Sequence, residues 1–286
     1  MPLPISPDPE NASRSSLPDD AAASPLSVAA DEAPPKAPAP PPPDRWRRAR
    51  EVATVAGRTA VTAAGVGFGC LAYAYLTLPD VRPLRVTNPP TTAFIDLRAD
   101  EFRSRGEQPR RVQRWVRYRD ISADLKRAVL LAEDTSFWQH EGVDFEQLQE
   151  SLEIDWAHGR LIRGGSTITQ QLAKNLYLSP SKNPIRKLRE LFIARRLEAE
   201  LPKARIFELY LNVIEWGDGV YGAEAAARTY FHTSAAALGP AEAALLAGAI
   251  VNPRVLNPAH PNARLLKRQQ LILRRMGAVL PPENAG

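Results

Sequence analysis

The sequence predicts a mainly α-helical protein in which one membrane helix precedes a single folded domain. Residues 59–78 form a run of 20 residues without a charged side chain. A helix rises about 1.5 Å per residue, so this run would span the roughly 30 Å of a bilayer core. From Ser122 onward, apolar residues recur at helical spacing and are interrupted by glycine and proline, which is typical of successive helices joined by turns.

The first 44 residues differ in composition from the rest of the chain. They hold 13 of the 27 prolines, no aromatic residue, and seven acidic against two basic side chains. Such a segment cannot bury enough apolar surface to offset the entropy lost on folding. We therefore expect residues 1–44 to be a disordered, acidic, proline-rich tail. Because the whole chain has a formal net charge of +5, the remaining residues carry +10.

The charges that flank the apolar run predict its orientation. Five arginines lie in a basic segment, 45–58, and only three follow within a similar distance. Positive charge is retained on the cytoplasmic side, so we expect a cytoplasmic N-terminus and an extracytoplasmic domain, residues 79–286, on the inner (plasma) membrane. A buried core helix is the alternative for 59–78. A cleavable signal peptide fits less well, because a long tail precedes the run.

The folded part is predicted to contain few strands and many helices. Short strands are expected over 91–97 and 111–118. Helices are expected from the cap residues Ser122 and Asp124 through Phe137, and over 144–158, 166–177, 184–200, 202–215, 221–229, 240–249 and 262–278. The single cysteine, Cys70, excludes an intramolecular disulfide framework, and no H-E-x-x-H motif supports a zinc hydrolase.

The stretch from Glu133 to Gly142, EDTSFWQHEG, contains a candidate general base. If it is helical, Glu133, Phe137 and His140 share one face. A carboxylate beside aromatic rings is partly desolvated, which raises its pKa toward that of a usable base. The alternative is a charge cluster at a helix end with the phenylalanine in the core.

The stretch 164–175, GGSTITQQLAKN, contains a candidate binding helix. Ser166 or Thr167 can cap it, and Thr167, Gln171 and Lys174 fall on one polar stripe. Hydroxyl, amide and ammonium groups suit sugar hydroxyls or phosphate. Two alternatives are a capped amphipathic helix with a solvated face and the recognition helix of a helix-turn-helix protein.

A third stretch, 182–192, surrounds one carboxylate, Glu190, with cations. Such a group can hold phosphate or pyrophosphate. The alternative is a surface ion pair between Arg186 and Glu190, worth about 0.3–0.5 kcal/mol. A fourth stretch, 208–231, is rich in small residues and is expected to be mostly scaffold.

In this order and spacing, the stretches resemble glycosyltransferase family 51, which polymerises peptidoglycan. Glu133 to Gly142 matches E-D-x-x-F-x-x-H-x-G, and Gly164 to Asn175 matches G-x-S-T-I-T-Q-Q-x-x-K-N. Arg186 to Glu190 matches R-K-x-x-E, Tyr210 to Phe231 matches the fourth motif, and the proline-rich stretch 252–258 is similar to the fifth. The resemblance covers roughly residues 79–280 and is closest to the monofunctional members of the family. S-x-x-K at 179–182 has no K-T-G downstream, so penicillin acylation is not expected.

The resemblance implies a lysozyme-like helical lobe with a small membrane-proximal jaw. It implies that lipid II and a growing lipid-linked glycan chain are substrates, and that Glu133 is the base in an inverting reaction. Glu190 would orient a pyrophosphate clamp whose candidate cations are Lys174, Lys182, Arg186, Lys187 and Arg189. The family often has arginine in place of Lys182. Candidate substrate-binding residues are Asp134, Phe137, His140, Gly142, Ser166, Thr167, Gln170, Gln171, Asn175 and Asn212.

No cofactor is required by these motifs. A lone carboxylate among cations is a poor metal site, so a divalent ion such as Mg²⁺ would bridge through pyrophosphate oxygens near Glu190. Other cell-wall synthesis or division proteins are candidate partners. Two rival functions are a lysozyme-like peptidoglycan hydrolase and a membrane-anchored nucleic-acid-binding protein. The cationic third motif argues against the hydrolase, because a glycan cleaved between sugars has no pyrophosphate to hold.

Overall fold

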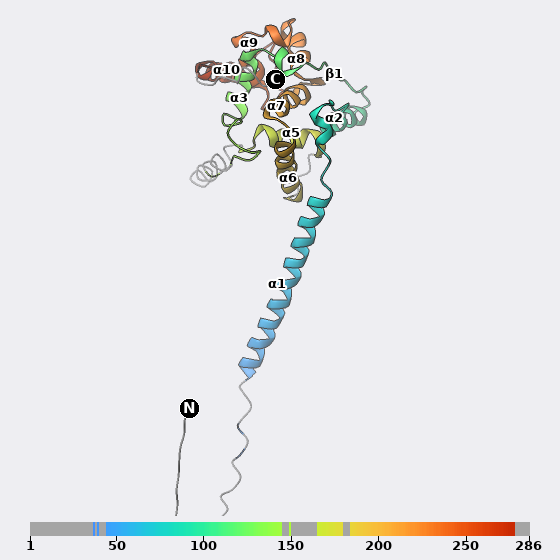
Figure 1. Ribbon diagram of the computed structural model, residues 1–286, viewed down its shortest axis with the longest axis vertical. Coiled ribbons are helices and arrows are strands. Elements are labelled where there is room, and N and C mark those ends of the chain that lie inside the picture. Colours follow the sequence, from blue (N-terminus) through green and yellow to red (C-terminus); the bar gives the residue numbers. More distant parts are fainter. Residues whose placement is uncertain are drawn as a thin grey trace, which may run out of the picture. The chain divides into compact units, whose positions relative to one another are not determined.

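The computed structural model describes residues 44–144, 165–179 and 184–277, together with residues 37, 39 and 149. It divides into two compact units, Met1–Gly57 and Arg58–Gly286. The described part of the second unit is mainly helical (Figure 1). The predicted disordered tail, the predicted helix 144–158 and Lys182 lie outside the described residues, apart from a few isolated positions.

The first helix, α1 (Asp44–Leu76), contains residues 59–76 of the predicted membrane segment and begins earlier than predicted, at the start of the basic stretch. Among the described residues it is the one helix long and apolar enough to cross a membrane, with a mean hydropathy of 1.4 over its most apolar window. Only 6% of that window is buried. The alternative of a buried core helix therefore does not fit the structure.

The segment after α1 differs from the prediction. The expected strand 91–97 is wrong, because this region begins the helix α2 (Ala93–Ser104). The β-branched Thr92 is the N-cap residue, and its hydroxyl accepts a hydrogen bond from the Ile95 amide at 3.1 Å. A short 3₁₀ helix, Arg82–Arg85, precedes α2, and another, Tyr118–Asp120, follows it along the chain.

The sheet has three short strands in the order β1-β3-β2. They are β1 (Val112–Gln113), β2 (Glu215–Gly217) and β3 (Val220–Tyr221). β1 pairs with β3 in parallel, and β2 pairs with β3 antiparallel. The predicted strand 111–118 thus shortens to two residues.

The helices of the domain agree closely with the prediction. They are α3 (Ala123–Glu133), α5 (Ile168–Tyr177), α6 (Pro184–Glu200), α7 (Lys203–Val213), α8 (Ala223–Phe231), α9 (Pro240–Ala249) and α10 (Ala263–Arg275), with a 3₁₀ turn at Ala235–Ala237. Ser122 caps α3 as predicted, because its hydroxyl accepts from the Leu125 amide. The expected helix from Ser122 through Phe137 is too long, because α3 ends at Glu133.

The core lies where these helices meet. α5 packs against both α6 and α7, while α3 packs against α9, and α9 against α10 (Figure 1). Ile168, Leu172 and Leu176 of α5 are buried in this core, as their helical spacing predicts. This packing brings the end of α3, the polar residues of α5 and the first turns of α6 into one neighbourhood.

Candidate active site

Glu133 is the last residue of α3 and is only partly exposed. Its Oε2 accepts a hydrogen bond from Gln171 Nε2 at 2.8 Å. Gln171 Oε1 in turn accepts from the Tyr210 hydroxyl at 3.0 Å. Because an ionised carboxylate only accepts, the amide presents its NH₂ group to Glu133, and the Tyr210 hydroxyl holds the amide in place by donating to the oxygen on its other side. A chain of two hydrogen bonds thus orients Glu133 from the core.

The environment of Glu133 raises the pKa of its carboxyl group. Burial is the largest cause, because desolvation disfavours the charged form. The hydrogen bond from Gln171 and the charges of Arg268 and Lys174 act in the opposite direction and lower the pKa. A carboxylate with a raised pKa and a partly exposed side chain is suited to accept a proton from a bound molecule.

Asp134, the next residue, has a different role. Its side chain is buried, and it accepts from the Ile168 amide at 2.9 Å and pairs with His140 Nε2 at 3.0 Å. A carboxylate at the first turn of α5 also interacts favourably with the helix dipole. Asp134 therefore ties the end of α3 to the start of α5, and it is not part of an exposed charge cluster.

The remaining residues of the first motif form the corner beside Asp134. Because α3 ends at Glu133, the expected common face of Glu133, Phe137 and His140 is wrong. Phe137 is fully buried, and Gly142 has φ +86° and lies so close to α6 that a Cβ would meet the Ala194 carbonyl at 3.2 Å. Phe137 and Gly142 thus shape the scaffold and offer no donor or acceptor side chain to a ligand.

On α5, consecutive glutamines face different partners. Thr167 caps the helix, accepting from the Gln170 amide, and donates to the Gly142 carbonyl at 2.7 Å. Gln170 Oε1 accepts from Lys187 Nζ of α6 at 3.2 Å, whereas Gln171 contacts Glu133. The predicted stripe is thus only partly exposed, since Thr167 is buried and Lys174 is exposed.

A cationic group lies at the first turns of α6. Glu190 is 3% exposed and accepts from Arg186 Nη1 at 2.9 Å and from Lys187 Nζ. Lys187 Nζ also reaches Ser166 Oγ at 3.3 Å. We call Ser166, Gln170, Arg186, Lys187 and Glu190 the clamp group. The alternative of a surface ion pair does not fit, because the carboxylate is buried.

The clamp group does not fit a direct metal site. Both Glu190 oxygens already accept hydrogen bonds from cations. No group of three or more histidine, cysteine, aspartate or glutamate residues is close enough to hold a metal within the described parts of the chain. Glu190 instead fixes the positions of two positive charges.

Three other predicted residues lie apart from the clamp group. Arg189 points to the end of α1, where it donates to the Thr77 hydroxyl at 2.6 Å and to the Thr77 carbonyl at 2.9 Å. Asn212 is buried, and its amide pairs with both the amide and the carbonyl of Val116 at 2.9 Å. Asn175 Nδ2 donates to the Gln171 carbonyl at 2.8 Å. These contacts stabilise the fold around the site.

A cavity of about 480 Å³ adjoins the clamp group. Gln170 and Lys187 form its polar side, and Leu188, Leu191 and Phe192 of α6 form its apolar side. The lining also includes Val143, Gly165 and Arg195. A ligand with a charged head and an apolar tail would fit such a division.

The comparisons with known proteins agree with this geometry. Residues 100–277 match the family model described as Transglycosylase. The chain belongs to the transglycosylase family. It is 49% identical over 195 residues to a biosynthetic peptidoglycan transglycosylase of Dechloromonas aromatica, covering 68% of this chain and 84% of the relative. A protein of the same name from Aromatoleum aromaticum is 52% identical over 167 residues, which are 58% of this chain and 73% of the relative.

The family membership confirms the prediction of a mainly helical glycosyltransferase of peptidoglycan synthesis. It does not favour the two rival functions. The rival recognition helix also conflicts with the structure of this transglycosylase, because Gln170 is 2% exposed and Gln171 is engaged with Glu133. A helix that reads DNA must present such side chains to solvent.

Sequence reasoning missed two residues beside the candidate site of this transglycosylase. Most of the stretch 208–231 is expected to be scaffold, yet the Tyr210 hydroxyl donates to Gln171. Arg268 of α10 was not singled out, yet its charge acts on Glu133. Neither interaction has a local sequence signal, because Tyr210 and Arg268 come close to Glu133 only through the packing of α7 and α10.

Proposed function

We propose that this transglycosylase polymerises lipid II into linear glycan strands with release of polyprenyl diphosphate. One observation carries the proposal: two consecutive residues of α5 contact two different charged groups. Gln171 donates to the candidate base Glu133, and Gln170 accepts from Lys187 of the clamp group. A reaction between an acceptor hydroxyl and a sugar diphosphate needs a base and an anion site held at a fixed separation. Gln170 and Gln171 provide that separation, because they are consecutive residues of one helix.

Glu133 is proposed as the general base. The anomeric carbon of the donor already has a good leaving group, so the reaction requires removal of the proton from the acceptor 4-hydroxyl. The oxygen then attacks the anomeric carbon as the bond to pyrophosphate breaks. Attack from the face opposite the pyrophosphate inverts the anomeric centre. The proton ends on Glu133, whose raised pKa favours holding it.

The clamp group is proposed to bind the pyrophosphate. Arg186 and Lys187 would stabilise the negative charge that develops on the leaving group, and Glu190 holds both cations in place. Lys174, which is exposed, would extend the group toward Glu133. Leu188, Leu191 and Phe192 would contact the first isoprene units of the lipid, because they line the cavity beside Lys187.

The proposed location is the inner membrane, with α1 as a single membrane-spanning anchor. Residues 1–44 and the basic segment 45–58 would be cytoplasmic, residues 59–78 would span the bilayer, and residues 79–286 would be the extracytoplasmic catalytic domain. The arginines of 45–58 support this orientation. A reporter enzyme fused after Gly286 should be active only outside the cytoplasm. A cytoplasmic signal would contradict the orientation.

The experiment that tests the activity uses purified full-length protein and labelled lipid II. We expect products of increasing length on a sizing gel, and digestion of these products by a muramidase to disaccharide units. Preformed glycan strands should not become shorter, which separates a transferase from the rival hydrolase. Failure to extend lipid II, or shortening of preformed strands, would contradict the proposal.

A further inference from the structure

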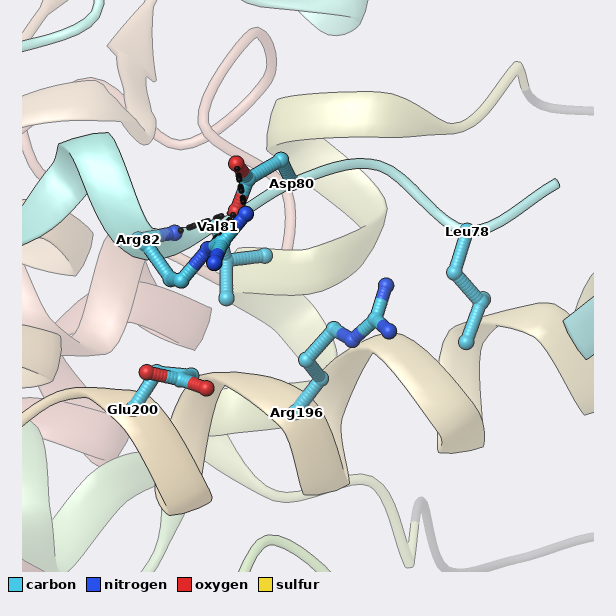
Figure 2. Close-up of a pocket in the computed structure, with 6 residues that line it drawn as sticks. All are labelled: Leu78, Asp80, Val81, Arg82, Arg196 and Glu200. Atoms are coloured by element: carbon cyan, nitrogen blue, oxygen red, sulfur yellow. Dashed lines mark hydrogen bonds and ion pairs between the residues drawn. The ribbon is translucent and has the colours of Figure 1, made fainter. Parts of the chain in front are cut away.

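A second pocket, of about 260 Å³, lies between α6 and the segment that follows α1. Figure 2 shows its six lining residues, of which two come from α6 and four from the connecting segment. They are Leu78, Asp80, Val81, Arg82, Arg196 and Glu200. The Arg196 side chain extends from α6 toward the connecting segment (Figure 2).

Contacts along one side of α6 fasten this segment close to the end of α1. Arg189 donates to Thr77, the ring of Phe192 meets the Tyr75 ring edge-on at 6.2 Å, and Arg196 Nη1 donates to the Pro79 carbonyl at 3.3 Å. α1 ends at Leu76, and Leu78, which lines the pocket, follows two residues later. A pocket this close to the end of a membrane helix lies at the depth of the lipid headgroups.

The pocket is distinct from the clamp group. Arg196 follows Lys187 by nine residues on α6, which is about two and a half turns of helix. The two side chains therefore leave opposite sides of the same helix. The two pockets share no lining residue.

The charges of the pocket leave one cation with unused donors. Arg82 pairs with Asp80 through two hydrogen bonds of 2.9 Å, and Arg85 pairs with Glu200 at 3.2 Å. The hydrogen bonds from the Arg82 side chain and amide, together with the charges of Arg82 and Arg196, lower the pKa of Asp80 to about 2. Arg196, which is partly buried, has one hydrogen bond, to the Pro79 carbonyl, within the described residues. A guanidinium carries five N–H donors in a fork that matches phosphate oxygens.

We propose that this pocket binds the phosphate of an anionic glycerophospholipid in the leaflet from which α1 emerges. Arg196 would donate to the phosphate oxygens, and the Arg82–Asp80 pair would form the rim. Leu78 offers apolar contact to the start of the acyl chains, which free phosphate lacks. The inference rests on the proposed membrane anchorage. Binding would hold the catalytic domain at a fixed height above the bilayer, through the contacts of α6.

The test measures lipid binding to the full-length protein in detergent micelles by native mass spectrometry. The probes are phosphatidylglycerol, phosphatidylcholine and inorganic phosphate. The parent should prefer phosphatidylglycerol, and Arg196→Gln should weaken that binding roughly tenfold or more, as expected for one charge-assisted contact. Arg196→Lys, which keeps the charge and loses the fork, should be intermediate. Arg119→Gln is the control. Arg119 is exposed, its ion pair with Asp120 is long at 3.8 Å, and it does not line the pocket.

Four results would overturn the inference. They are unchanged phosphatidylglycerol binding by Arg196→Gln, an equal loss in Arg119→Gln, equal binding of phosphatidylcholine, and competition by inorganic phosphate as strong as that of the lipid. Flotation of the parent with phosphatidylcholine vesicles tests the anchorage separately. A parent protein that does not float contradicts the anchorage. If the parent floats but Arg196→Gln binds phosphatidylglycerol unchanged, only the headgroup site is contradicted.

Discussion

Tyr210 provides a test of how the fold controls the base. Its hydroxyl donates to Gln171 Oε1, and Gln171 Nε2 donates to Glu133, so the tyrosine helps hold the amide that donates to the carboxylate. Tyr210→Phe removes a neutral hydrogen bond inside the core. Such a bond contributes about 0.5–1.5 kcal/mol, a factor of roughly 2 to 13 in an equilibrium.

The effect should depend on pH. The hydrogen bond from Gln171 lowers the pKa of Glu133, so a weaker bond raises that pKa further. A general base acts in its ionised form. The acidic limb of kcat/KM in Tyr210→Phe should therefore move to higher pH, with a loss of roughly 2- to 13-fold on that limb and recovery at alkaline pH.

The assay is the initial rate of lipid II polymerisation across pH, with the unfolding free energy measured in parallel. Tyr221→Phe is the matched control, because Tyr221 is 1% exposed and its hydroxyl has no hydrogen-bond partner among the described residues. Its pH profile should equal that of the parent. The reasoning is refuted if Tyr210→Phe leaves the profile unchanged, or if Tyr221→Phe moves it equally.

Three further predictions follow from the same contacts. Burial raises the pKa of Glu133 above its value of 4.5 in the unfolded chain. The folded state therefore loses stability as pH rises through this range. Glu133→Gln should unfold at a higher temperature than the parent at pH 7, and this difference should vanish at about pH 4. Asp134→Ala leaves a buried amide of α5 without its acceptor and should cost about 1–3 kcal/mol in urea unfolding, whereas Asp100→Ala, on the surface, should cost less than about 0.5 kcal/mol. Lys187→Ala should weaken binding of a fluorescent polyprenyl diphosphate analogue by about 1.5–3 kcal/mol, and Arg189→Ala, which contacts Thr77, should change that affinity by less than about twofold; equal losses in both variants would contradict the division between them.

The helices were predictable from sequence because their signals are local. α6 and α9 have the predicted bounds, since proline begins each helix and apolar residues recur along it. The strand expected at 91–97 was wrong because propensity alone does not reveal that Thr92 acts as a cap. The helix expected beyond Glu133 was wrong for a different reason. Asp134 leaves the helical conformation, with φ −164°, and its side chain binds the start of α5, 34 residues away.

The candidate site shows the same difference between local signals and contacts that are distant in the sequence. The residue types in the motifs identified Glu133 and the Arg186–Glu190 group, and the structure brings both to α5. Local spacing could not separate Lys187, which faces α5, from Arg189, which contacts the end of α1, 112 residues earlier. The orienting role of Tyr210 likewise depends on the packing of α7 against α5.

The most direct test of the central claim is the polymerisation of labelled lipid II by Glu133→Gln at neutral pH. The substitution keeps the size of the side chain and can still pair with Gln171, but an amide cannot accept the proton. Turnover should fall by at least roughly 10²- to 10⁴-fold, the usual contribution of a general base. Binding of the polyprenyl diphosphate analogue should persist, because Lys187 and Arg186 are unchanged. Polymerisation close to the parental rate would contradict the assignment, and Glu190 would then be the first carboxylate to test as the base.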